Sequence, residues 1–223
     1  MPEDYQKSFH EQLDELDDRF TKAGMRIAEQ MPRLVEGYLA AEQEVIADAR
    51  RLMVDSSEDC RAIEDRGFVL LARHQPMGSD LRLLVALLRM CVDVDRSAAL
   101  LRHVCESLRV SDPRLLPDTL AQQLRDLALR SAEVFEGGMD AWRSKDALAV
   151  NDLDQADEQV DRLQRLLLDT AIEDDRAAEE RLSLGLVARY LERIADHGVA
   201  IARDTSFVAT GERVVLPSSS AAS

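Results

Sequence analysis

The chain has 223 residues, of which 46% are apolar, so it is long and apolar enough to bury a core, and a disordered chain is excluded. Its 43 acidic and 28 basic side chains give a net charge of −15, which repels a phosphate backbone, so no nucleic-acid partner is expected. Only 4% of the residues are aromatic, and Leu, Ala, Glu, Asp and Arg dominate. This mixture is rich in helix formers and poor in strand formers, and it predicts an all-α fold.

Helix-breaking residues, mainly proline and glycine, divide the sequence into six predicted helices, in two groups of three. The first group covers residues 5–39, with a kink at Pro32, then residues 42–74, ended by Pro76, and residues 80–109. The second group covers residues 119–143, with a bend at residues 137–138, then 146–174 and 180–211. Short connections favour antiparallel neighbours, so the pattern predicts an internal duplication: two tandem antiparallel three-helix bundles placed end to end.

A linker separates the two groups of helices. Two prolines, two acids and a serine fall within residues 111–118, a composition typical of a loop. We therefore expect a first three-helix repeat over residues 1–110, a linker over 111–118, a second three-helix repeat over 119–211 and a flexible tail over 212–223.

No export signal or membrane span is predicted. The first residues of the chain lack the basic start and apolar stretch of a secretory signal, and the longest apolar run covers only residues 83–88. Cys60, Cys91 and Cys105 are odd in number and show no CxxC spacing, which favours a reducing compartment. A cytoplasmic protein that reaches a membrane only through its partners is expected.

Two pairs of acidic residues recur at positions i and i+4 in the second group of helices. Asp157 and Asp161 leave one side of the helix predicted over 146–174, and Glu192 and Asp196 leave one side of the next helix. Like charges at this spacing weaken a helix unless a cation lies between them. Two interpretations stay open, a cation site of four carboxylates or a solvated acidic face. In both, Glu192 and Asp196 point away from the apolar stripe of their helix, which contains Leu186, Tyr190, Ile194 and Ile201.

No catalytic motif is found. None of the four histidines follows an acid by three residues, so the Glu-x-x-His pattern of di-iron enzymes is absent. The HExxH zinc motif and the GxxxxGK phosphate loop are absent as well. We therefore expect no enzyme, and we expect the single histidines and cysteines to be packed or half-exposed parts of the scaffold.

Three segments resemble the PhoU family of phosphate-uptake regulators. The segment R-Y-L-E-R-I-A-D-H at residues 189–197 resembles the family signature R-Y-L-E-R-I-G-D-H. H-Q-P-M-G-S-D-L-R at residues 74–82 resembles R-Q-P-x-A-x-D-L-R, and residues 207–212 resemble F-x-x-T-G-E. These matches follow one another in the family's order, so the resemblance spans the chain.

The resemblance implies two three-helix bundles with multinuclear metal sites built from E(D)xxxD pairs. It assigns Asp157, Asp161, Glu192 and Asp196 as ligands of divalent or trivalent metal ions, and it leaves the metal open among Mg²⁺, Mn²⁺, iron and Zn²⁺. It also implies a cytoplasmic negative regulator that is not an enzyme. Such proteins are thought to couple the ATPase subunit of the phosphate ABC transporter to a membrane sensor histidine kinase, and so to keep uptake and the phosphate-starvation response off when phosphate is plentiful.

The first repeat departs from the family pattern. Aligned without gaps, its four ligand positions hold one acid and three other residues: Asp95, Ala99, Met53 and Ser57. Asp55 and Asp59 have the right spacing but are shifted by about 200° around their helix. Metal is therefore expected only in the second repeat.

Two other functions stay open beside the regulator. One is a metal-free helical scaffold or sensor of the same fold that serves another transporter. The other is a carboxylate-bridged metalloenzyme, against which the missing Glu-x-x-His pattern counts.

A homodimer or a partner contact is expected through the helix predicted over 80–109. This helix carries two apolar stripes on different sides, one of Leu81, Val85, Leu88, Val92 and Ala99 and one of Leu83, Leu87, Met90, Val94 and Leu101. Two neighbours in a three-helix bundle cover one broad side, so either the kinked first helix wraps far enough to bury the rest, or a second chain covers it.

Overall fold

The computed structural model describes residues 2–110 and 112–212. Within these ranges the chain is all-α and contains no strand, as the composition predicts. The helices are α1 (Pro2–Leu39), α2 (Gln43–His74), α3 (Gly78–Leu108), the short 3-10 helix η1 (Pro113–Leu115), α4 (Asp118–Ser144), α5 (Ala149–Glu173) and α6 (Ala178–Thr210). No predicted helix end differs from these bounds by more than three residues. The tail predicted over residues 212–223 lies almost entirely outside the described residues.

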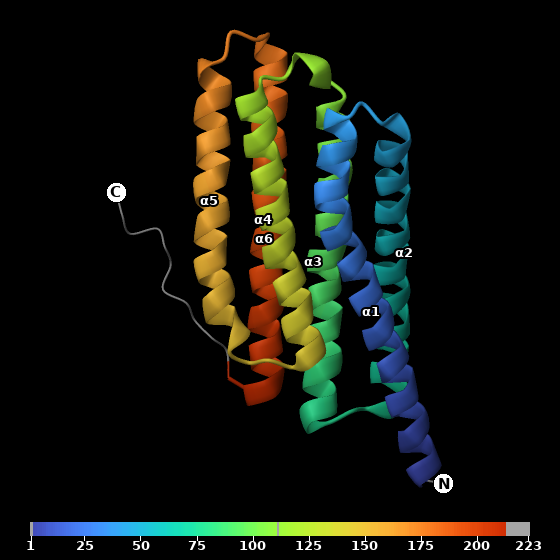
Figure 1. The fold of residues 1–223 in the computed structure, drawn as a ribbon. Coiled ribbons are helices and arrows are strands. Elements are labelled where there is room, and N and C mark those ends of the chain that lie inside the picture. The colour runs from blue at the N-terminus through green and yellow to red at the C-terminus, as the bar shows by residue number, and fades with distance from the viewer. Residues whose placement is uncertain (1, 111, 213–223) are drawn as a thin grey trace.

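Residues that are predicted to end helices also end them in the structure, at α2 and α6. Gln75 adopts a left-handed conformation (φ 47°) directly before Pro76 and ends α2. Gly211 (φ 79°) ends α6 and donates its backbone N–H to the carbonyl of Phe207, a conformation that glycine adopts without a Cβ clash. Pro32 does not end α1, which continues through it and changes direction along its length (Figure 1).

The two three-helix bundles lie side by side, so the expected end-to-end arrangement is wrong. Figure 1 shows α1, α2 and α3 beside α4, α5 and α6, with α3 next to α6. Extensive contacts join α3 to α6 and α1 to α4, and one hydrophobic core runs through both bundles. The physical reason is that α3 and α6 are apolar around much of their circumference. Each of them needs a neighbour from the other bundle in addition to those in its own.

Polar side chains on α3 and α6 are paired across this interface. The Ser97 hydroxyl lies 2.8 Å from Nδ1 of His197, and Arg89 forms an ion pair with Asp204 at 3.4 Å. Burial, with the nearby Arg193 and Arg96, lowers the pKa of His197 to about 4. His197 is therefore neutral near pH 7 and forms a buried hydrogen bond rather than a buried charge, in line with the scaffold role expected of the histidines.

Two glycines allow α4 and α6 to approach at backbone distance. A Cβ added to Gly138 would lie 2.2 Å from the carbonyl oxygen of Gly198, and one added to Gly198 would lie 2.6 Å from the Cα of Phe135. The helix α4 runs through residues 137–138 without interruption. The glycine predicted as part of a bend at position 138 therefore serves a close helix crossing.

Replacing Gly138 with alanine is expected to destabilise the fold by about 1–3 kcal/mol, because the new methyl group would meet backbone atoms that cannot rotate away. Gly137→Ala is a matched control: its Cβ would meet only the flexible end of Leu153, and alanine improves helix propensity by about 1 kcal/mol. Thermal unfolding followed by circular dichroism measures both variants. Equal melting temperatures for the two would contradict the close crossing.

Candidate metal centre

The four acids assigned as ligands lie where α5 and α6 pack against each other. We call Asp157 and Asp161 of α5 together with Glu192 and Asp196 of α6 the acidic seam. Asp157 and Asp161 are partly buried, and Asp196 is exposed. Glu192 is only 6% exposed, which makes it the one buried carboxylate of the seam.

The side chains of α6 are not distributed as the predicted apolar stripe requires. Leu186 and Tyr190 were expected in the core, but Leu186 is exposed and Tyr190 is only partly buried. Glu192 was expected to point away from the core, but it is buried. The reason is that α6 contacts α3, α4 and α5, so its buried surface covers more of its circumference than one stripe.

One of the two carboxylate oxygens of Glu192 has no hydrogen-bond partner among the described residues. Arg189 donates a hydrogen bond to Oε1 at 2.5 Å, while Oε2 is buried and unpaired. On the facing helix, Oδ1 of Asp157 is also buried and unpaired. A buried oxygen that lacks a donor costs stability, so the seam has unused acceptor capacity.

The carboxylates of the seam raise one another's pKa. Burial, followed by the charges of Asp196, Asp161 and Glu192, raises the pKa of Asp157 to about 7. The pKa of Glu192 also rises to about 7, because burial and the charge of Asp196 outweigh the opposing effect of Arg189. Partial desolvation and Asp161 raise the pKa of Asp196 as well. These shifts have the sign expected of acids crowded together without a compensating cation.

This set of oxygen donors suits a hard cation. Carboxylate oxygens are the ligands that Mg²⁺ and Mn²⁺ prefer, and among the described residues Asp161 forms an ion pair with the exposed Arg165 at 3.5 Å. Throughout the described ranges, no three His, Cys, Asp or Glu side chains converge closely enough to form a ready-made metal site. The seam is thus an acidic surface that lacks compensating positive charge. Metal binding would require its side chains to move closer together.

In the first repeat an arginine occupies the corresponding helix contact. Met53 and Ser57, at the positions that align with Asp157 and Asp161, are buried. Arg102 of α3 reaches across to α2 and donates to the Ser57 hydroxyl at 3.1 Å and to the Met53 carbonyl at 3.3 Å. A positive charge of the protein itself therefore lies at this contact. The sequence already distinguishes the two repeats at this position, because Arg102 aligns with the apolar Val199 of the second repeat.

The shifted acids of α2 do not restore a site in the first repeat. Asp59 turns toward α1, where it forms ion pairs with Arg19 at 2.6 Å and with Arg26. These two arginines lower the pKa of Asp59 although burial opposes them. Asp59 is thus neutralised by α1, and Asp55, one helical turn before it, is only partly buried.

Residues 124–205, which contain the whole acidic seam, match the PhoU domain. The phosphate-specific transport system accessory protein PhoU homolog 1 of Mycobacterium leprae is 28% identical over 211 residues, covering 92% of this chain and 93% of that protein. The PhoU homolog of Rhizobium meliloti is 29% identical over 212 residues, covering 92% of this chain and 88% of that protein. The chain is thus similar to PhoU proteins over nearly its whole length, and residues 124–205 match the PhoU domain.

Solved PhoU structures share the fold. PhoU from Pseudomonas aeruginosa has a TM-score of 0.84 at 23% identity, covering 92% of this chain and 100% of that one. The phosphate transport system regulatory protein PhoU from Streptococcus pneumoniae has a TM-score of 0.79 at 23% identity, covering 93% and 100%. The predicted pair of three-helix bundles is thus confirmed as the PhoU fold.

The relatives that this PhoU homologue resembles are named as accessory proteins of the phosphate-specific transport system. No helix in the described part of the chain is long and apolar enough to cross a membrane.

Neutralising one carboxylate of the seam should stabilise the metal-free protein. A carboxyl group whose pKa is raised by folding costs stability once it is ionised, and for Asp157 that cost is complete above about pH 7. Asp157→Asn should therefore raise the melting temperature at pH 8 in the presence of EDTA. Asp169→Asn, on an exposed position of the same helix, should change it little. A large fall for Asp157→Asn would show that its charge is already compensated inside the fold.

Proposed function

We propose that this PhoU homologue is a cytoplasmic negative regulator of phosphate uptake and of phosphate-starvation signalling. It acts as an adaptor between the ATPase subunit of a phosphate ABC transporter and a membrane sensor histidine kinase, and it holds both off when phosphate is plentiful. The support is the match of residues 124–205 to the PhoU domain together with the names of the relatives, which are accessory proteins of phosphate transport. The expected homodimer belongs to the same proposal.

The observation that carries metal binding is the buried, unpaired Oε2 of Glu192. Asp157 and Asp161 would hold one or more cations from α5, and Glu192 and Asp196 from α6. A bound Mg²⁺, Mn²⁺, iron or Zn²⁺ would supply positive charge to the seam and cross-link the two helices. Arg189 fixes one oxygen of Glu192 and leaves the other for the cation.

No chemical step is part of the proposed mechanism. The chain would act through the surface that it presents, and charge neutralisation at the seam would fix α5 and α6 against each other. The four carboxylates lie on the facing helices α5 and α6, and a bound cation would draw their side chains together.

A metal-free scaffold of the same fold is the second candidate, because the seam side chains do not form a closed metal group. In that case the carboxylates would serve as an acidic docking surface. The two candidates differ in one measurable property, the metal content of the folded protein.

The double variant Asp161→Ala/Asp196→Ala should lose the metal that the wild type retains after soaking and desalting, because it removes one ligand from each helix. Elemental analysis by mass spectrometry measures the stoichiometry, and Asp55→Ala/Asp59→Ala is the matched control in the first repeat. The control should retain the metal. Metal that persists in the seam variant, or that disappears in the control, would contradict the assignment.

The same variants separate regulation from metal binding in cells that lack the endogenous gene. Wild type should repress a phosphate-starvation reporter in phosphate-rich medium. A seam variant that is folded, free of metal and still fully repressive would favour the metal-free scaffold. A wild-type chain that does not repress the reporter would contradict the regulatory proposal itself.

A further inference from the structure

Two of the three cysteines lie inside the first bundle, on neighbouring helices. Cys60 of α2 is 1% exposed, and Cys91 of α3 is fully buried in the hydrophobic core. The side of α3 that carries Leu81, Val85 and Val92 is exposed, so the alternative in which α1 wraps round to bury this side is wrong. Cys91 therefore leaves α3 on the side that packs against its neighbours.

The register of α2 against α3 places the two cysteines opposite each other. A Cβ added to Gly67 of α2 would lie 3.5 Å from Cδ1 of Leu84 on α3. Cys60 lies about two helical turns before Gly67, and Cys91 lies about two turns after Leu84. Residues two turns apart leave a helix on the same side, and α2 and α3 run antiparallel (Figure 1). The contact that Gly67 makes with Leu84 is therefore repeated, two turns along both helices, by Cys60 with Cys91.

The two thiols are in direct contact. Cys91 shares a hydrogen bond with Cys60, and small buried residues flank the pair along the same contact, Gly67 on α2 and Ala98 on α3. Small side chains let two helices approach closely. A disulfide requires such an approach, because the two Cα atoms that it joins lie within about 7 Å of each other.

The surroundings of Cys91 keep it reduced until an oxidant arrives. Its hydrogen bond with Cys60, its burial and the charges of Cys60, Glu64 and Asp95 raise the pKa of the Cys91 thiol. Cys91 is therefore protonated at neutral pH, and a thiol reacts with oxidants far more slowly than a thiolate. All three cysteines are free in this structure.

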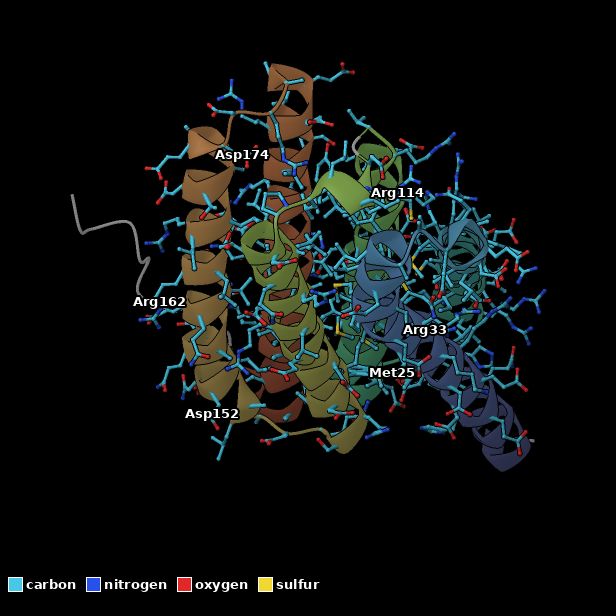
Figure 2. The ribbon with its side chains drawn as sticks, turned by 45° about the horizontal axis from the view of Figure 1, so that its top comes forward. Met25, Arg33, Arg114, Asp152, Arg162 and Asp174 are labelled. Atoms are coloured by element: carbon cyan, nitrogen blue, oxygen red, sulfur yellow. The ribbon has the colours of Figure 1, made fainter. Side chains whose placement is uncertain are left out.

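The cysteine contact joins the outermost helix of the first bundle to the rest of the fold. Extensive contacts connect α2 to α1 and α3 alone among the described helices. Figure 2 shows α2 from a second side, and in both views it lies on the side of the first bundle that faces away from α5. A helix held by two neighbours opens locally more readily than one held by three. A small oxidant reaches the two sulfurs during such an opening.

We propose that Cys60 and Cys91 are the site of a reversible oxidation by hydrogen peroxide, which joins them in a disulfide and fastens α2 to α3. One sulfur attacks a peroxide oxygen, the O–O bond breaks, and the thiol proton leaves with the departing hydroxide as water. The second sulfur then attacks the sulfenic acid formed on the first, the S–O bond breaks, and a second water leaves with the other thiol proton. The two sulfurs lose two electrons in total, and the two peroxide oxygens gain them.

The disulfide would have the same mechanical effect in the first repeat as a cation between α5 and α6 in the second. In each repeat it would tie the outer helix to the helix that packs against the other bundle. The oxidation involves no metal, so it depends neither on the seam nor on the proposed regulatory function. Thiol reductants reverse the bond, so the reduced pair is the resting state in a reducing compartment.

Tryptic peptides identify the bond directly. Arginines bound each cysteine, so trypsin places Cys60, Cys91 and Cys105 in separate peptides, residues 52–61, 90–96 and 103–109. The folded full chain is treated with hydrogen peroxide in the presence of EDTA, its remaining thiols are alkylated, and it is digested without reductant. Mass spectrometry should find peptide 52–61 joined to peptide 90–96, with a mass two hydrogens below their sum. Peptide 103–109 should be unlinked, and dithiothreitol should separate the joined pair.

The bond should also raise the melting temperature of the folded chain by about 5–10 °C, because it restricts the unfolded chain between residues 60 and 91. Cys60→Ala and Cys91→Ala should each abolish both the linked peptide and this rise. Cys105→Ala, at a third buried cysteine, is the matched control and should keep both. Circular dichroism before oxidation confirms that each variant is folded.

Three results would overturn the proposal. The first is a folded wild-type chain from which peroxide yields only unlinked cysteine peptides, or peptides in which Cys105 is linked. The second is a link that forms only after urea has unfolded the chain. The third is a link between Cys60 and Cys91 that leaves the melting temperature unchanged or lower, since such a bond would not fasten α2 to α3.

Discussion

The requirement that α6 be covered by three neighbouring helices sets most of the architecture. The helix contacts α3, α4 and α5, and its approach to α4 depends on Gly138 and Gly198, which meet at backbone distance. This coverage joins the two bundles through one core and also buries Glu192 beside α5. A buried carboxylate with one unpaired oxygen is the electrostatic consequence, and the raised pKa values of the seam follow from it.

The corresponding helix contacts of the two repeats, α2 with α3 and α5 with α6, carry different charged side chains. In the first repeat Arg102 crosses from α3 to α2 and bonds to Ser57, and Asp59 is neutralised by arginines of α1. In the second repeat the acids of the seam are opposed by Arg189 and Arg165, with Arg193 near Asp196, and the pKa of Asp157, Glu192 and Asp196 is nevertheless raised. We infer that the second repeat needs a cation from solution, whereas the first carries its own. Under the proposed function, one repeat would be independent of metal and the other would respond to it.

The sequence was sufficient for those features that depend on local chemistry. Pro76, the linker prolines and Gly211 mark helix ends because they act on their own backbone, and spacing at i and i+4 puts each pair of seam acids on one side of a helix. Features that depend on which helices pack against each other could not be predicted from the sequence. Apolar stripes show that a face is covered but not by which helix, so the lateral packing of the bundles and the burial of Glu192 were missed. For the same reason the sequence predicts a bend at Gly138 and not a helix crossing, whereas the alignment of Arg102 with the apolar Val199 is a difference that the sequence does show.

The location of bound metal tests this account most directly. Anomalous diffraction from crystals grown with Mn²⁺ would give that location independently of any variant. The account predicts one or more anomalous peaks between α5 and α6, within coordination distance of Glu192 and the aspartates of the seam, and none beside Arg102 between α2 and α3. A peak next to Ser57 and Asp95, or a seam that stays free of metal at saturating Mn²⁺, would contradict it.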